Sequence, residues 1–249
     1  MGFMKDNRLV LNFLVFAEKV ENGALQSELL PEIAELGFQS VEIRREYFKD
    51  LEKEMPVIKA EAERLKLELF YSVPDEVYVD GKINPKLKNY LAEAQQMGVK
   101  HIKWNIGAFE GDLHEDELKT LIESGVAITI ENDQTQTSGT IAAIQTYMKA
   151  IKAADLAIGY VYDLGNWRFV GEDEMKAAEA LTDYVQYIHM KDVGYENDQP
   201  KAAGLDHGEI DWRKVLTILP KNRPIAIEYP TTSNAEILEA KKLLEEAID

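Results

Sequence analysis

Short apolar runs alternate with longer amphipathic stretches along the chain. Eight runs of six to eight residues are rich in apolar side chains, and they cover residues 9–16, 38–43, 67–72, 100–106, 126–131, 158–163, 185–190 and 224–229. Nearly continuous apolar runs are typical of strands that are buried on both faces. The segments between them, with apolar residues at helical spacing over roughly 10 to 15 residues, predict crossover helices. The pattern therefore predicts a parallel sheet built from repeated strand and helix units.

A short repeat supports these boundaries. The segments AELGFQSVEI, QQMGVKHIKW and IESGVAITIE each place a glycine between the end of a predicted helix and the start of a predicted strand. We expect Gly37, Gly98 and Gly125 to adopt the left-handed conformation that ends a helix. After the last strand, the sequence NAEILEAKKLLEEAI predicts a final helix with Asn234 as its N-terminal cap.

Length and composition fit one domain. A chain of 249 residues has the size that a (β/α)8 TIM barrel typically needs. No low-complexity segment or proline-rich linker divides the chain. We therefore predict the α/β fold class, with a single TIM-barrel domain over residues 1–249.

The charge and the cysteine content argue against several functions. The 45 acidic residues outnumber the 28 Lys and Arg, and the formal net charge of −17 repels nucleic acid and anionic membrane surfaces. The sequence has no cysteine, which excludes disulfides, a thiolate zinc site and a cysteine nucleophile. The first apolar run is interrupted by Asn12 and is too short to span a membrane. We expect a cytoplasmic protein that binds neither nucleic acid nor membranes.

Four of the predicted strands end beside a side chain that can bind a divalent cation. These side chains are Glu131, Asp163, His189 and Glu228, referred to below as the quartet. The carboxyl ends of barrel strands meet at one mouth, so the quartet can surround a single ion there. Each residue alone has a simpler explanation: an ion pair for either glutamate, a turn cap for Asp163 and a hydrogen-bonded core histidine for His189. Because four predicted strands each end beside a possible ligand, the metal site is favoured over these separate explanations.

With these residues in place, the chain resembles the xylose isomerase-like TIM-barrel superfamily, which includes sugar phosphate isomerases and epimerases and the AP endonuclease family 2. The matching segments span nearly the whole chain and are GFQSVEIR, ITIEN, VYDLGNW, YIHMKD, GEIDW and AIEYP. The order Glu, Asp, His, Glu, with gaps of 32, 26 and 39 residues, is similar to the metal-binding set of the ketose 3-epimerases in that superfamily.

The resemblance implies an enzyme that uses one divalent metal ion, Mn²⁺, Co²⁺, Mg²⁺ or Zn²⁺, held by the quartet. Three carboxylates and one imidazole suit hard or borderline ions. The ion would bind a carbonyl and a neighbouring hydroxyl and stabilise an enediolate, while Glu131 and Glu228 exchange the proton as base and acid. The expected function is a sugar isomerase or epimerase acting on a small ketose or related polyhydroxy carbonyl compound.

Five further residues are candidates for substrate binding. Glu42 and Lys191 can bind hydroxyl groups, Trp104 and Trp167 can supply aromatic walls, and His207 lies in a glycine-flanked loop that can reach the substrate. Each also has a structural explanation. Glu42 and Lys191 can form ion pairs, the tryptophans can pack in the core, and His207 can face solvent.

The chain departs from the superfamily at two places. Asn166 stands where many members have a histidine, and the third predicted strand ends in Tyr71 and Ser72. The residues present can therefore bind a single ion. Together with the acidic surface, this argues against DNA cleavage. Two rival functions stay open: an inosose dehydratase-like lyase and a non-catalytic sugar-binding barrel. The sequence also leaves open whether the substrate is phosphorylated and whether the chain forms a homo-oligomer.

Overall fold

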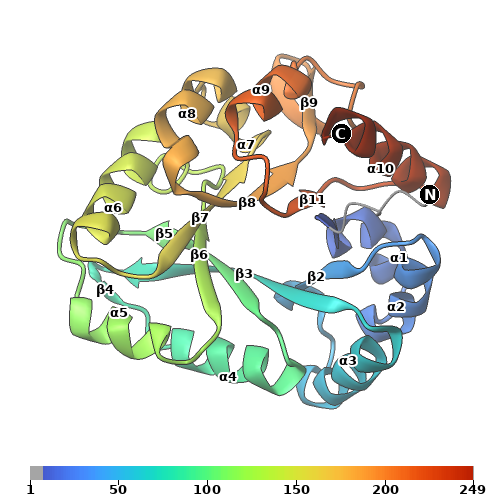
Figure 1. Cartoon of the computed structure of the whole chain (residues 1–249), viewed down its shortest axis with the longest axis horizontal. Helices are drawn as coiled ribbons and strands as arrows, with labels where there is room; N and C mark the ends of the chain where they lie inside the picture. Colours follow the sequence, from blue (N-terminus) through green and yellow to red (C-terminus); the bar gives the residue numbers. More distant parts are fainter. Residues whose placement is uncertain (1–7, 249) are drawn as a thin grey trace.

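A closed parallel barrel surrounded by helices forms the protein (Figure 1). The computed structural model describes residues 8–248. The barrel strands are β1 (Leu9–Asn12), β2 (Ser40–Arg44), β3 (Glu68–Val79), β5 (His101–Gly107), β6 (Ala127–Glu131), β7 (Ile158–Asp163), β8 (Val185–Met190) and β11 (Ile225–Ile227). They pair in that order, and the pairing of β11 with β1 closes the ring. The predicted α/β TIM barrel is confirmed.

Helices connect the strands and form the outer ring. They are α1 (Ala17–Glu21), α2 (Gln26–Glu35), α3 (Leu51–Leu65), α4 (Leu87–Met97), α5 (Glu115–Ile122), α6 (Ile141–Ala153), α7 (Asn166–Phe169), α8 (Glu174–Leu181), α9 (Trp212–Ile218) and α10 (Asn234–Ile248). Short 3₁₀ helices cover Phe13–Phe16, Arg45–Tyr47 and Thr182–Tyr184. Within residues 8–248, no helix combines the length and apolarity that crossing a bilayer requires.

Most predicted strands match the observed ones within two residues, but three segments differ. The first apolar run is a strand only as far as Asn12, because the Asn12 side chain accepts a hydrogen bond from the backbone of Leu14 and caps a 3₁₀ helix. Strand β3 continues beyond its predicted end and pairs with the short strand β4 (Lys82–Ile83). A hairpin of β9 (Asp192–Glu196) and β10 (Gln199–Ala203), which the apolar pattern did not predict, follows β8.

The repeated glycines behave as predicted. Gly37, Gly98 and Gly125 each have a φ of 78°, in the left-handed region. The predicted cap of the last helix is wrong by one residue, because Ser233 accepts the hydrogen bond from the backbone of Glu236 while the Asn234 side chain donates to Glu32. This second bond connects α10 to α2.

The inside of the barrel changes from apolar to polar toward its carboxyl end. A small apolar cluster fills the interior and consists of Val10, Phe70, Val161, Tyr187 and Ala226. Alternate residues of a barrel strand point inward, so the inward residue two positions later on each strand is polar. These polar residues are Asn12, Ser72, Asp163, His189 and Glu228, and all are buried. The apolar cluster is therefore the floor on which a polar site rests.

Candidate metal centre

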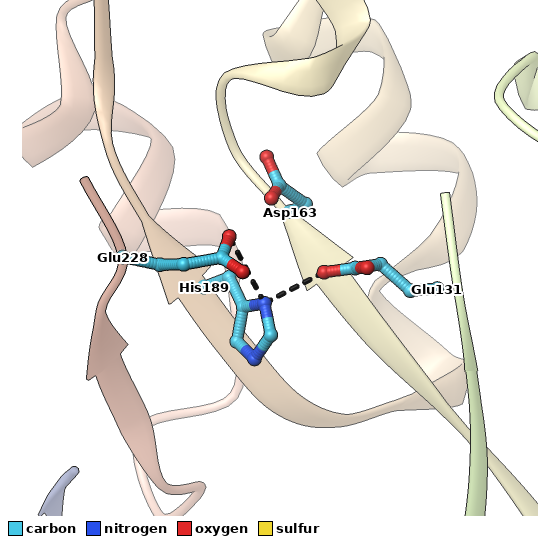
Figure 2. A group of neighbouring side chains, drawn as sticks. All are labelled: Glu131, Asp163, His189 and Glu228. Atoms are coloured by element: carbon cyan, nitrogen blue, oxygen red, sulfur yellow. Dashed lines mark ion pairs between the residues drawn. The ribbon is translucent and has the colours of Figure 1, made fainter. Parts of the chain in front are cut away.

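The quartet comes together at the carboxyl end of the barrel. Glu131 and Asp163 are the last residues of β6 and β7, His189 lies in β8, and Glu228 directly follows β11. Each side chain offers one ligand atom, and these atoms lie within 4.8 Å of one another. All four residues are buried, with at most 4% of their surface exposed. Figure 2 shows the carboxylates of Glu131 and Glu228 converging on Nδ1 of His189 from two directions.

Asp163 has two tasks, one for each carboxylate oxygen. Its Oδ1 accepts hydrogen bonds from the backbone N–H groups of Gly165 and Asn166, at 3.0 and 2.9 Å. This is the turn cap that the sequence offered as a simpler explanation. Its Oδ2 instead faces the cluster, 2.7 Å from the ammonium of Lys191. The turn therefore fixes the orientation of an oxygen that remains available to the site.

The imidazole of His189 contacts carboxylates on both sides. Its Nδ1 lies 2.6 Å from Glu131 Oε1 and 3.3 Å from Glu228 Oε2. Its Nε2 lies 2.9 Å from Glu42 Oε2. A carboxylate beside one ring nitrogen holds the proton there and leaves the other nitrogen free to bind a cation.

Glu42 is itself held in place by two donors. The Asn12 side-chain amide and the Tyr187 hydroxyl donate to its Oε2 at 2.8 and 2.9 Å. Glu42 has no exposed surface. The structure therefore places a fixed carboxylate, that of Glu42, against His189 Nε2, where it can orient the imidazole.

Two buried lysines neutralise part of the acidic charge. Lys103 Nζ lies 2.5 Å from Glu131 Oε2. Lys191 Nζ lies 2.7 Å from Asp163 Oδ2 and 3.2 Å from Glu228 Oε2. Buried carboxylates are costly without such partners, so the two ammonium groups allow three acidic side chains to stay together inside the barrel.

Arg44 supplies a third positive charge. Its Nη1 donates to Glu228 Oε1 at 3.0 Å and to Asn12 Oδ1 at 3.2 Å, and its Nε donates to Glu46 at 2.6 Å. Through these bonds Arg44 connects the end of β2 to the end of β11 across β1. Glu228 is thus held from one side by Arg44 and from the other by Lys191.

Burial and neighbouring charges shift the pKa values of the three quartet carboxylates in different directions. Although burial opposes the change, attraction to Lys103 and His189 lowers the pKa of Glu131 to about 2. The pKa of Glu228 also falls well below its usual value, because Lys191 and His189 outweigh burial. Burial raises the pKa of Asp163 to about 7, with Lys191 opposing the shift and Glu228 supporting it. The two glutamates therefore differ from the aspartate in the ease with which they lose a proton.

The residues present fit a divalent cation. Three buried ligand atoms, Glu131 Oε1, Asp163 Oδ2 and His189 Nδ1, have no well-aligned hydrogen bond within residues 8–248. Buried polar atoms normally have such a partner. Carboxylate oxygens and one imidazole nitrogen are the ligands that Mn²⁺, Co²⁺, Mg²⁺ and Zn²⁺ accept. The quartet is therefore a group that can bind a metal ion.

The other predicted site residues lie in different surroundings. Lys191 contacts the quartet directly, as described above. Trp104 and Trp167 are buried in the large apolar core, with 1% and 0% of their surface exposed. His207 is exposed and lines a separate cavity of about 510 Å³ that is bordered by Tyr229 and by residues of α10. The structure thus does not bring the tryptophans or His207 into contact with the quartet.

Four residues of the site were missing from the sequence prediction: Asn12, Arg44, Lys103 and Tyr187. Each belongs to a barrel strand and occupies one of the alternate positions that point inward, as Glu42 and the quartet residues do. A strict two-residue count along the predicted strands would have indicated them. Their contacts with particular carboxylates depend on strand register, which the sequence alone does not provide.

Comparisons with known proteins agree with the fold. No curated protein sequence matches the chain. A xylose isomerase domain protein from Salmonella typhimurium LT2 has a similar structure, with a TM-score of 0.73, 16% identity and 100% coverage of both chains. The IolI protein with a bound zinc atom gives a TM-score of 0.72 at 15% identity and covers 97% of this chain and 98% of its own. An L-ribulose 3-epimerase has a TM-score of 0.73 at 14% identity, and the match covers 98% of this chain and 95% of the epimerase.

The sequence itself matches a family description over most of its length. The match covers residues 30–249, and its description is xylose isomerase-like TIM barrel, of the AP endonuclease family 2 type. These residues include the whole quartet and seven of the eight barrel strands. The chain belongs to the xylose isomerase-like TIM barrel family.

Proposed function

We propose that the protein is a divalent-metal-dependent isomerase or epimerase of a small ketose or a related polyhydroxy carbonyl compound. The observation that carries the proposal is the buried quartet, whose ligand atoms lie within 4.8 Å of one another. Family membership and the epimerase fold neighbour support the same class of reaction. The proposed ligands are the four quartet residues, and the ion is Mn²⁺, Co²⁺, Mg²⁺ or Zn²⁺.

When bound, a divalent ion would polarise a substrate carbonyl and lower the energy of the negative charge that develops on its oxygen. The two glutamates would move the proton. Glu131 and Glu228 approach His189 Nδ1 from two directions, so a substrate carbon between their carboxylates can lose a proton to one and regain it from the other. If the proton returns to the same carbon on the opposite face, the product is an epimer. If it returns to the neighbouring carbon, the product is an isomer.

Lys103, Lys191 and Arg44 would assist by holding these two carboxylates still. Each glutamate has at least one cationic partner on the side away from His189 Nδ1. Fixed partners keep a general base oriented toward the substrate. Glu42 would orient His189 in the same way through its contact with Nε2.

Hydrogen exchange is the most informative test of the proposed function. The Mn²⁺-loaded protein is incubated in D₂O with a panel of ketoses and inososes, and the products are followed by NMR and mass spectrometry. Incorporation of deuterium next to the carbonyl, without loss of water, is the expected result. Loss of 18 mass units from an inosose would instead identify the lyase that the sequence left open. No exchange and no turnover with any member of the panel would contradict the proposed function.

A further inference from the structure

A second group of polar side chains lines the mouth beside Glu131. Ser72 on β3 and Lys103 and Asn105 on β5 share the inward-facing alternation of the barrel, because Phe70, two residues before Ser72, packs in the interior cluster. In the strand register Ser72 lies opposite Lys103, and Asn105 lies opposite Glu131. The three side chains therefore form one continuous wall next to the quartet.

Two of these side chains have hydrogen-bonding atoms without a partner in the part of the chain that the structure describes. Ser72 has no exposed surface, and its Oγ has no hydrogen bond among the described residues. The same holds for Asn105 Oδ1, which is buried although the rest of its residue is partly exposed. By contrast, the hydroxyl of Thr129, which lies opposite Lys103 on the adjacent strand, donates to the carbonyl of Ile102 at 3.0 Å. Unpaired buried polar groups are rare and costly, so each needs a reason.

Lys103 has unused donors at the same wall. Its ammonium carries three N–H groups, and within residues 8–248 its hydrogen bond is to a single carboxylate, Glu131. Lys103 is 6% exposed, so its remaining donors are buried beside Glu131 and Ser72. The wall thus presents a hydroxyl, an amide oxygen acceptor and ammonium donors side by side.

This combination matches the hydroxyl groups of a sugar or polyol better than a phosphate. A hydroxyl both donates and accepts, so adjacent hydroxyls can donate to Asn105 Oδ1, accept from Lys103 and do either with Ser72. A phosphate at pH 7 is mainly an acceptor, and Asn105 Oδ1 and the carboxylate of Glu131 would repel it. The wall therefore favours a neutral hydroxylated chain.

We propose that Ser72, Lys103 and Asn105 form a hydroxyl-binding subsite that holds the part of the substrate next to the reacting carbon. The inference rests on the proposed function, because it places a polyhydroxylated substrate at the quartet. It goes further in naming the side chains that select an unphosphorylated polyol chain.

The test uses sorbitol, a polyol without a carbonyl group, so that binding is measured without turnover. Its dissociation constant is determined by titration calorimetry or ligand-observed NMR for the full chain, with and without Mn²⁺. Ser72→Ala and Asn105→Ala should each weaken sorbitol binding about three- to tenfold, the loss expected for one neutral hydrogen bond. Ser72→Ala should keep or raise the melting temperature, because it removes an unpaired buried hydroxyl.

Thr129→Val is the matched control. It also removes a buried hydroxyl beside this wall, but one whose hydrogen bond lies within the protein. It should lower the melting temperature and leave the sorbitol affinity unchanged. Equal sorbitol affinity in the parent and in Ser72→Ala, or no binding of sorbitol to the parent, would overturn the subsite.

The outcomes separate the subsite from the proposed function. If sorbitol binding depends on Ser72 and Asn105 but no substrate hydrogen exchanges, the subsite stands and the isomerase proposal fails. If substrates exchange hydrogen but the variants bind sorbitol like the parent, the isomerase proposal stands and the subsite fails.

Discussion

Carboxylates contact both ring nitrogens of His189, and these contacts fix the orientation of its imidazole. Glu42 lies at Nε2 and two glutamates lie at Nδ1. Asn12 and Tyr187 hold Glu42 through hydrogen bonds. The histidine that the sequence offered as a possible ligand thus depends on a second layer of residues for its orientation.

Replacement of Glu42 tests this second layer. Glu42→Gln keeps the shape of the side chain but removes the negative charge beside His189, so the affinity for Mn²⁺ should fall about 10- to 100-fold. Competition with a chelator measures the change. Glu54→Gln is the matched control, because Glu54 is also buried but accepts a hydrogen bond from the backbone of Ser27, away from the quartet. A Glu42→Gln protein with the parent's Mn²⁺ affinity would show that Glu42 has no part in orienting the ligand.

Replacement of Glu228 tests the proposed proton transfer. Glu228→Gln preserves the volume and removes the base, so hydrogen exchange into the substrate should fall about 100- to 10,000-fold. The far-ultraviolet circular dichroism spectrum should stay that of the parent. Exchange at the parent rate in this variant would exclude Glu228 as a base.

At the residue scale, the sequence predicted the acidic members of the site better than the basic ones. An ionisable residue at the end of an apolar strand is conspicuous, which led to all four quartet residues. Lys103 and Arg44 also stand at strand positions, but lysine and arginine near strand ends are common on surfaces, and only the strand register shows which carboxylates they contact.

At the scale of the elements, glycine marks the change from helix to strand. Gly98 ends α4 with a φ of 78°, and a Cβ atom built there would meet no heavy atom within 4 Å. The need for glycine at this position is therefore conformational and does not arise from crowding. This is why a short sequence repeat could predict three helix ends correctly.

Substitutions at Gly98 should follow the left-handed preference of the new residue. Gly98→Ala should lower the free energy of unfolding by about 1 kcal/mol, because alanine pays the full cost of the left-handed conformation. Gly98→Asn should cost less, since asparagine tolerates this region. Urea unfolding measures both. Equal stability of the parent and the alanine variant would contradict the conformational explanation.

The elements that the sequence did not predict are the ones that depend on distant contacts. The β9–β10 hairpin has polar and partly exposed residues with no clear apolar alternation. Its base is held by Asp192, whose carboxylate accepts hydrogen bonds from the backbone of Gly208 and Ile210. Such a loop is stabilised by side-chain bonds across 16 to 18 residues, which local propensity does not reveal.

At the scale of the whole molecule, the barrel isolates a small polar region from an otherwise apolar interior. Arg44, Lys103 and Lys191 pair with the three carboxylates of the quartet, so the acidic cluster is largely neutralised within the chain. We therefore expect the metal-free protein to be folded, and a metal ion to add stability to an existing structure. Strongly negative overall charge, at −17, further favours the attraction of cations.

Addition of metal should raise the melting temperature. A ligand at 100 times its dissociation constant that binds only the folded state stabilises it by about 2.7 kcal/mol. For a chain of this size the corresponding shift is about 5 to 10 °C. Differential scanning calorimetry with and without Mn²⁺ measures it, and His189→Ala should lose the shift. If the parent and this variant respond alike, the quartet is not the site of stabilisation.

The most direct test of the account is a crystal structure of the protein with Mn²⁺, recorded with anomalous scattering at the manganese edge. We predict one strong anomalous peak inside the barrel mouth, about 2.0 to 2.3 Å from a ligand atom of each quartet residue. A structure without a peak there, in which Glu131 and Glu228 contact only their lysine and arginine partners, would contradict the proposal of a metal-dependent enzyme.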